Sequence, residues 1–342
     1  MDGFLVKTQE LRRRICEEAE AKMNLPAVSL EKDFWVCWIL SKLYSIPEWN
    51  QNLTFKGGTS LSKCWDLISR FSEDIDIVID KGFLGFGGTE SPEEAPSNKQ
   101  KKKRLKNLKH IAHKRIHEEL APLLAEKIES TLRGSDNWEL TAVSITEDPD
   151  GQTLLFRYPS ALDGGKSYIR RVVKIEMGAR SDNEPLREEN IHPYLFDVFP
   201  DILGPGDVRV RALAPERTFW EKAMLLHEEN FRPSDKLRKP RMARHYYDLW
   251  CLIGKGIGDR AVKRHDIFER TAVHRQVYFR WTWMDYSTLK KGKLRIVPEV
   301  DQEAEWRRDY GAMQNEMFYG YAPSFDEVLQ VVSEFEQAFN RD

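Results

Sequence analysis

This sequence of 342 residues has few cysteines, no long apolar run and almost equal numbers of positive and negative side chains. The four cysteines are scattered without a CxxC spacing, which argues against a disulfide framework or a zinc site. The longest apolar run near the N-terminus, FWVCWIL, is far shorter than the ~20 residues of a membrane span. The charged N-terminal residues do not resemble a secretory signal either. These absences predict a cytoplasmic protein with no membrane partner.

Neither the net charge nor a sequence repeat reduces the number of possible functions. The formal net charge is −2, which neither requires nor excludes a nucleic-acid partner, and the sequence has no internal repeat. Hydrophobic residues make up 41% of the chain and charged residues 32%, a balance that provides ample material for a core. A chain of this length can form two domains, and we expect them to join near the GPGD turn, as residues 1–205 and 206–342.

Helical and strand-like patterns alternate in the first of these domains. Two helices are expected within residues 8–46, followed by a strand, a glycine turn, a helix and a strand within residues 53–80. After an exposed loop and a basic helix, three strands within residues 138–179 resemble a meander added to a sheet. Helices dominate beyond residue 213. This order predicts an α+β fold with a mixed sheet and a mostly helical C-terminal domain.

Two aspartates lie one residue apart in the second strand pattern, EDIDIVI. Side chains two residues apart on a strand share a face, so Asp74 and Asp76 project together while the neighbouring isoleucines face a core. Carboxylates this close repel one another unless a cation lies between them, and oxygen-only ligands suit Mg²⁺. A DxD alone is more often a solvent-facing strand edge, so its context decides.

The context is a glycine turn between the preceding strand and helix. Gly57 and Gly58 stand where backbone N–H groups and a helix N-terminus can receive a phosphate, and Thr59 and Ser60 supply hydroxyls at the same place. Taken alone, such a turn is a tight connection closed by a serine cap. Next to paired aspartates it predicts a nucleotide-binding turn.

A third acid stands on a later strand. In VVKIEM, alternation places Lys174 and Glu176 on one face of an otherwise apolar strand, where a metal or a phosphate would explain them; an exposed strand face is the alternative. The glycine turn, a DxD about sixteen residues later and a single acid on a further strand resemble the signature of the polymerase β-like nucleotidyltransferases. Three such acids can hold one or two Mg²⁺ ions beside a nucleoside triphosphate (NTP) substrate.

The wider sequence resembles the AbiEii/AbiGii-type toxin nucleotidyltransferases, which include the MenT-type toxins. The matching pieces, in the family's order over residues 31–250, are EKDFWVCWIL, FKGGTSLSK, RFSEDIDI, VKIEMG, LAPERTFWEKAMLL and ARHYYDLW. The resemblance implies a polymerase β-like nucleotidyltransferase core coupled to a helical C-terminal part. It also implies transfer of nucleotides from an NTP to RNA, in characterised members to tRNA 3′ ends. The implied setting is a toxin–antitoxin or phage-defence system with a cognate antitoxin protein.

The resemblance also assigns roles to single residues. Ser72 and Asp74 match the family's SxD, and Asp76 matches its second metal-binding acid. Lys222, in FWEKAMLL, matches the lysine expected at the triphosphate, and a lysine in an otherwise apolar helix needs an anion or a route to water. Residues 31–33 match the family's EKD, which carries no assigned role.

The acid of the family's RDxxD-like motif is matched by Asp248, in HYYDLW. His245 replaces the usual first aspartate of that motif, which leaves the role of position 245 open. Arg217 and Arg244 are further candidates for phosphate contact because a planar guanidinium suits phosphate geometry, although a surface charge is the commoner role for each.

Two basic clusters are candidates for contacting RNA. Residues 95–117 hold nine lysines and arginines and no acid, Lys101, Lys102 and Lys103 among them, and could equally form a solvated helix face. The second cluster adjoins Asp248 and is the better candidate. It contains Arg238, Lys239, Arg241 and Arg244.

Two other functions remain open at this point. The same core could modify a protein hydroxyl, by AMPylation or a kinase-like reaction, and loss of the basic clusters should then barely affect activity. A non-enzymatic module could instead bind nucleotide or RNA without turnover, although three intact acids around a phosphate turn argue against it. The sequence identifies neither the NTP nor the acceptor.

Overall fold

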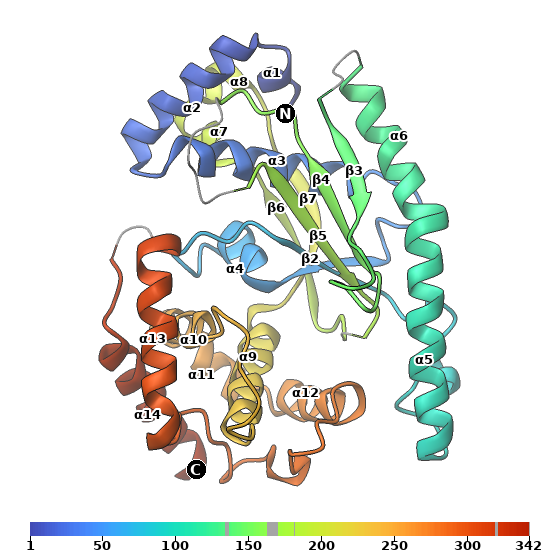
Figure 1. Ribbon diagram of the computed structural model, residues 1–342, viewed down its shortest axis with the longest axis vertical. Coiled ribbons are helices and arrows are strands. Elements are labelled where there is room, and N and C mark those ends of the chain that lie inside the picture. The colour runs from blue at the N-terminus through green and yellow to red at the C-terminus, as the bar shows by residue number, and fades with distance from the viewer. Residues whose placement is uncertain (134–136, 163–169, 181, 319–320, 342) are drawn as a thin grey trace. The chain divides into compact units, whose positions relative to one another are not determined.

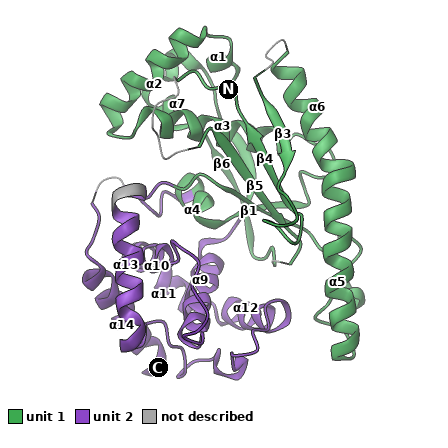
Figure 2. Ribbon diagram, in the orientation of Figure 1, with its two compact units in different colours: residues 1–64, 72–212 green, residues 65–71, 213–342 purple. Residues whose placement is uncertain are grey.

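The chain forms two compact units, shown in different colours in Figure 2. The computed structural model describes residues 1–133, 137–162, 170–180, 182–318 and 321–341. The first unit comprises residues 1–64 and 72–212, and the second comprises residues 65–71 and 213–342. The sequence placed the join between residues 205 and 206. In the structure, strand β7 (Val208–Leu213) is hydrogen-bonded into the sheet, so the first unit continues through residue 212.

A mixed seven-stranded sheet forms the centre of the first unit, in the order β3-β4-β5-β2-β1-β7-β6 (Figure 1). The other strands are β1 (Leu53–Lys56), β2 (Ile75–Ile79), β3 (Glu139–Ala142), β4 (Thr153–Arg157), β5 (Val172–Gly178) and β6 (Leu186–Ile191). Strands β3, β4 and β5 form the expected antiparallel meander, and β2 pairs with β5 in parallel. Strand β1 pairs antiparallel with β2 and parallel with β7, which makes the sheet mixed.

Strand β6 was not predicted, because its sequence, LREENI, is mostly polar and only its last residue is buried. The α+β class, by contrast, is confirmed by the mixed sheet together with the helices of both units. Hydrophobic alternation therefore failed for the mostly polar β6, although it predicted β3, which has no buried residue.

Helix α3 (Ala27–Leu43) forms much of the core of the first unit, with fourteen of its seventeen residues buried. Trp35 and Trp38 pack on Phe156 of β4 at ring-centroid distances of 5.9 and 5.7 Å. The other helices of this unit are α1 (Asp2–Leu5), α2 (Gln9–Met23), α4 (Gly57–Trp65), α5 (Asn98–Arg115), α6 (Ala121–Thr131), α7 (Tyr194–Val198) and α8 (Pro200–Leu203). A helix that is buried on all sides has to be surrounded, and α3 contacts α2, α6, α7 and β5.

The second unit is helical, as the sequence predicted. Its helices are α9 (Pro215–Asn230), α10 (Arg244–Gly254), α11 (Ile257–Val262), α12 (His265–Tyr278), α13 (Val300–Met317) and α14 (Phe325–Arg341). Trp220 of α9 is fully buried and contacts Phe268 and Phe339, and its indole N–H donates to the Ala261 carbonyl at 3.1 Å. Among the described residues, none of the helices combines the length and hydropathy that a membrane span requires.

Candidate functional site

The glycine turn joins β1 directly to helix α4, because β1 ends at Lys56 and α4 begins at Gly57. Gly57 has a φ of +80°, and a Cβ added there would lie 2.0 Å from the Asp76 Oδ2 atom. Only glycine tolerates both conditions. The close approach places the backbone at the start of α4 against the carboxylate of Asp76, so the turn and the acidic strand form one feature.

Two hydroxyls fix the relation between the turn and the acids. Thr59 Oγ1 lies 2.9 Å from Ser72 Oγ and donates to the Asp74 carbonyl at 2.6 Å. Ser60 Oγ donates to the Gly57 carbonyl at 3.0 Å. Because Thr59 and Ser60 are both buried and bonded within the unit, their side chains brace the site. What α4 offers to a ligand is its N-terminal backbone.

The acids lie side by side on neighbouring strands. Asp76 of β2 and Glu176 of β5 are direct partners in the parallel register, and both are partly exposed while Ile75 and Ile77 are buried. Asp74 immediately precedes β2 and is also partly exposed. Strand alternation thus points the acids away from the core, as the sequence predicted.

Crowding of these carboxylates changes their acidity. Burial, followed by the negative charge of Glu176, raises the pKa of Asp76 to about 7. Burial, Glu176 and Glu73 likewise raise the pKa of Asp74 above its ordinary value. A cation would stabilise these acids, because burial first and the neighbouring carboxylates second disfavour their charged forms.

Lys174 provides part of the positive charge that these carboxylates need, because its ammonium group forms an ion pair with Glu176. Both side chains of the pair are about 40% exposed. Among the described parts of the chain, no three His, Cys, Asp or Glu side chains converge as a ready-made metal centre. The arrangement still fits Mg²⁺, which takes only one or two carboxylates and completes its shell with water and substrate phosphates. The oxygen-only donors and the raised pKa values are the observations that favour such an ion.

A second polar cluster is buried in the helical unit. Asp248 of α10 is completely buried and accepts from Arg70 Nε at 2.7 Å, from Arg70 Nη2 at 2.8 Å and from Lys222 Nζ of α9 at 2.8 Å. Burial alone would raise the pKa of Asp248, but Arg70 and Lys222 hold it well below its ordinary value. The sequence predicted Lys222 and Asp248 but not Arg70, whose only signal was its position two residues before the SxD motif.

His245 lies beside this cluster. Burial first, then the charges of Lys222 and Arg244, hold its pKa well below the ordinary value of histidine, so the imidazole is neutral. Among the atoms described, its Nδ1 is buried without a hydrogen-bond partner. With a neutral residue in place of an aspartate, Asp248 is the carboxylate that balances Arg70 and Lys222, which leaves the cluster net positive and suited to an anion.

The profile of the nucleotidyl transferase AbiEii toxin family, type IV toxin–antitoxin system, matches residues 38–331, well over half of the chain. The chain belongs to the AbiEii family. It is therefore a nucleotidyltransferase toxin of a type IV toxin–antitoxin system, which implies an NTP substrate and a cognate antitoxin. The family recognised from the sequence motifs is confirmed, and its EKD motif lies just before the matched range.

A solved structure is also similar to this AbiEii chain. MenT4, a nucleotidyltransferase toxin from Mycobacterium tuberculosis H37Rv, is 17% identical, with 98% of this chain and 100% of that chain covered and a TM-score of 0.43. No curated protein matches the chain in sequence.

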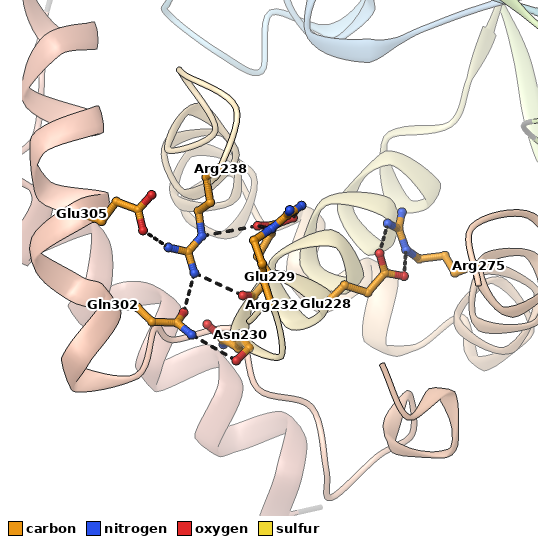
Figure 3. Close-up of polar contacts among 8 residues, drawn as sticks. All are labelled: Glu228, Glu229, Asn230, Arg232, Arg238, Arg275, Gln302 and Glu305. Atoms are coloured by element: carbon orange, nitrogen blue, oxygen red, sulfur yellow. Dashed lines mark hydrogen bonds and ion pairs between the residues drawn. The ribbon is translucent and has the colours of Figure 1, made fainter. Parts of the chain in front are cut away.

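The basic residues that the sequence predicted to contact RNA differ in their exposure to solvent in the AbiEii chain. Arg238 is largely buried and forms an internal network with Glu229, Gln302 and Glu305, as Figure 3 shows. A guanidinium already surrounded by carboxylates and an amide braces α9 against α13 and has little capacity for RNA. The same figure shows a buried ion pair between Glu228 and Arg275.

The remaining basic candidates for RNA contact in the AbiEii chain lie at or near the surface. Lys239, Lys102 and Lys103 are exposed, and Lys101 is partly exposed on α5. Arg241, with a φ of +66°, is held by its backbone N–H, which donates to Asp309 at 2.6 Å, so its side chain is presented from a braced turn. Two further arginines are less exposed. Arg244 is partly exposed, and Arg217 is completely buried 3.4 Å from Glu221.

Proposed function

We propose that this AbiEii chain is a Mg²⁺-dependent enzyme that transfers a nucleotide from an NTP to the 3′-hydroxyl of tRNA. The observation that carries the proposal is the apposition of Asp76 and Glu176, with the Gly57 backbone packed against Asp76. It unites a phosphate-type turn with a carboxylate pair whose charges favour a cation. In the reaction, the acceptor hydroxyl releases its proton to solvent as its oxygen bonds to the α-phosphorus, the α–β phosphoanhydride bond breaks and pyrophosphate leaves.

The first unit would hold the cation and the triphosphate. Asp74, Asp76 and Glu176 supply carboxylate oxygens for one or two Mg²⁺ ions, which when bound would neutralise the phosphates and activate the attacking hydroxyl. Backbone N–H groups at Gly57 and Gly58, at the start of α4, face the phosphates. The Lys174 ammonium, which is part-exposed beside Glu176, contributes a further positive charge toward the phosphates.

Bracing of this site would fall to the hydroxyls of Thr59, Ser60 and Ser72. Thr59 and Ser72 hold each other, and Ser60 closes the first turn of α4. In this proposal all three shape nucleotide binding indirectly, by fixing the backbone that meets the phosphates and the strand that carries the acids.

In the second unit, the net positive cluster around Asp248 would hold a phosphate of the nucleotide or of the RNA. Lys222 and Arg70 are the cations that Asp248 holds in place, and Arg244 lies near enough to influence the pKa values of both Lys222 and His245. Asp248 would therefore act by orienting Lys222 and Arg70. The exposed lysines on α5, with Lys239 and Arg241, support RNA as the acceptor because they can neutralise its backbone without reading its sequence.

Incubation of the purified protein with Mg²⁺, total tRNA and each α-³²P-labelled NTP in turn tests the proposal directly. Asp74→Asn keeps the shape of the side chain and removes its charge. Asp201→Asn makes the same change at an exposed acid of α8 in the same unit, away from the strands that carry the acids. We expect label in tRNA from the wild type and from Asp201→Asn, and a loss of at least about 100-fold for Asp74→Asn, because it removes a direct cation ligand.

Each other outcome points to a different function. Label on protein in place of tRNA would mean that the same core modifies a protein hydroxyl. Nucleotide binding without label on either acceptor would mean a binding module without turnover. Full activity of Asp74→Asn would refute the assignment of the acids even if tRNA were labelled.

A further inference from the structure

Helix α3 carries three consecutive charged side chains that the structure buries almost completely. Glu31, Lys32 and Asp33 are 0%, 2% and 6% exposed. Charged groups are rarely placed in a core, because each loses its hydration and must be paired to be tolerated. The EKD motif is therefore an internal feature, with a role that the assignment of the acids and the phosphate turn leaves unexplained.

Each of the three side chains is paired with a different segment of the first unit. Because successive helical residues point about 100° apart, three neighbours can reach in three directions. Glu31 accepts from Ser160 Oγ at 2.6 Å and from the Ala161 backbone at 2.5 Å. The next two pairs involve segments beside the proposed active site.

Asp33 holds the C-terminal end of α4, the helix that begins at the glycine turn and that we call the phosphate helix. Its Oδ1 lies 2.8 Å from Nζ of Lys63, and its Oδ2 accepts from the Tyr194 backbone at 2.7 Å. Lys63 is in the last turn of α4, and its side chain is almost fully buried, so the positive charge also complements the C-terminal end of that helix. Asp33 thus ties the helix that begins at the glycine turn to α3.

Lys32 holds the segment that leads to the acids. Its Nζ lies 2.9 Å from Glu73 Oε2, and the Lys32 side chain is almost fully buried. Glu73 stands between Ser72 and Asp74, and both of these neighbours are bonded to Thr59 of α4. The segment of residues 72–74 is therefore gripped from α4 on one side and from α3 on the other.

Stability alone does not explain such a pair. The Lys32 end of the pair is buried and the Glu73 side chain is 29% exposed. Such a pair contributes little to the free energy of unfolding, because desolvation of the lysine and screening at the glutamate both offset the attraction. What a charged pair adds is a defined geometry. Here the pair fixes the position of Glu73, the residue immediately before Asp74. The charge of Lys32 also opposes the rise in the pKa of Asp74.

We infer that Lys32 is a positioning residue that acts through Glu73 to hold Asp74 in the orientation needed for binding the divalent cation. With Asp33 and Lys63, it forms what we call the EKD clamp, which sets the phosphate helix and the acidic strand relative to α3. The inference rests on the proposed function, because it assumes that Asp74 is a cation ligand.

Binding of Mn²⁺ tests the clamp without turnover. It is measured by the loss of the free-ion EPR signal on adding protein, relative to the same mixture of Mn²⁺ and a non-hydrolysable α,β-methylene NTP analogue of each base without protein. We expect Lys32→Met to weaken Mn²⁺ binding by about 10- to 100-fold, as changes behind metal ligands do. Lys42→Met is the matched control, since Lys42 is on the same helix and bonds Thr131 at 2.8 Å; it should bind Mn²⁺ like the wild type.

The double variant K32M/E73M separates positioning from stability, because an apolar pair can restore the free energy of unfolding without restoring the geometry. We expect it to unfold at a temperature close to that of the wild type and still to bind Mn²⁺ weakly. Wild-type affinity in the double variant would overturn the clamp alone. Wild-type affinity in Asp74→Asn, or no Mn²⁺ binding by the wild type, would overturn the cation site of the proposed function and the clamp with it.

Discussion

Replacing Asp248 by asparagine keeps the shape of the side chain and removes the negative charge that Arg70 and Lys222 both contact. Asp248 is fully buried, and the side chains of its two partners are 3% and 8% exposed. Neither cation can reach water without moving the backbone that holds it, which is α9 for Lys222 and the segment before β2 for Arg70. The variant therefore leaves two buried positive charges facing a neutral amide.

The cost follows from that geometry. Removing one partner of a buried, hydrogen-bonded ion pair costs about 3–5 kcal/mol of unfolding free energy, much of it the penalty of the charge left behind. A unit of this size loses roughly 2–4 °C of Tm per kcal/mol, so we expect Tm to fall on the order of 10 °C. Differential scanning calorimetry of the full chain measures it.

The dependence of stability on pH provides a second test of the contacts of Asp248 with Arg70 and Lys222. Arg70 and Lys222 hold the folded pKa of Asp248 below its unfolded value, so its contribution to stability is present above the unfolded pKa and is lost as pH falls toward the folded pKa. The wild type should thus lose more stability than Asp248→Asn as the pH falls below about 4.

Asp266→Asn is the matched control. Asp266 lies in the same unit and has the same bidentate arrangement, with Arg264 Nε and Nη2 at 2.8 and 2.7 Å, but both side chains are exposed. Solvent screens that pair, so its Tm should match that of the wild type. If Asp248→Asn lowered Tm no more than this control, the reasoning from burial would be refuted.

Three further predictions concern the first unit. Gly57→Ala should abolish binding of a fluorescent NTP analogue, because its Cβ would lie 2.0 Å from Asp76 Oδ2 at a φ of +80°. Replacing Lys101, Lys102 and Lys103 together by glutamine should weaken tRNA binding and reduce its log–log salt slope by about 2 to 3, measured by filter binding. In cation-free buffer, the folded pKa of Asp76, about 7, should make the wild type lose Tm relative to Asp76→Asn as pH rises from about 4 to 7, because folding favours the protonated acid.

The first two of these have a control within the chain, and the third has an outcome that would refute it. Gly254→Ala should bind NTP normally, because a Cβ there meets no atom within 4 Å; equal loss in both glycine variants would contradict the role of the Asp76 contact. Glutamines at the exposed Lys290, Lys291 and Lys293 remove the same charge elsewhere, and an equal change in tRNA affinity would mean that net charge, not α5, matters. A Tm profile of Asp76→Asn parallel to that of the wild type would show that Asp76 does not titrate near neutral pH.

Local sequence patterns were sufficient for the elements that carry the site. The glycine turn and the alternating EDIDIVI predicted β1, α4 and β2, because turn chemistry and strand periodicity are properties of neighbouring residues. Local patterns could not predict that Asp76 and Glu176 lie side by side. It depends on β2 and β5 pairing in parallel across about a hundred residues of chain, and no local pattern encodes such a register.

Arg70 and Arg238 show the same limit for charged side chains. Arg70 lies in an undistinguished loop, and its partner Asp248 is 178 residues away in sequence. Arg238 belongs to a basic stretch typical of an RNA-binding surface, yet Glu229 and Glu305 from α9 and α13 enclose it. Whether a charge is solvated or enclosed depends on which helices pack around it, and that information is distributed over the whole unit.

The excursion of residues 65–71 into the helical unit determines how this protein can be divided. These residues lie in sequence between α4 and β2, but Arg70 bonds Asp248 and pairs with Phe318, and the Phe71 backbone donates to Met317 at 2.6 Å. A fragment of residues 206–342 would lack the segment that contacts Asp248, Met317 and Phe318. The complementary fragment would retain a seven-residue segment severed from its partners, immediately before Ser72. The helical half is therefore not a continuous stretch of sequence, and a single cut in the chain cannot separate the two units intact.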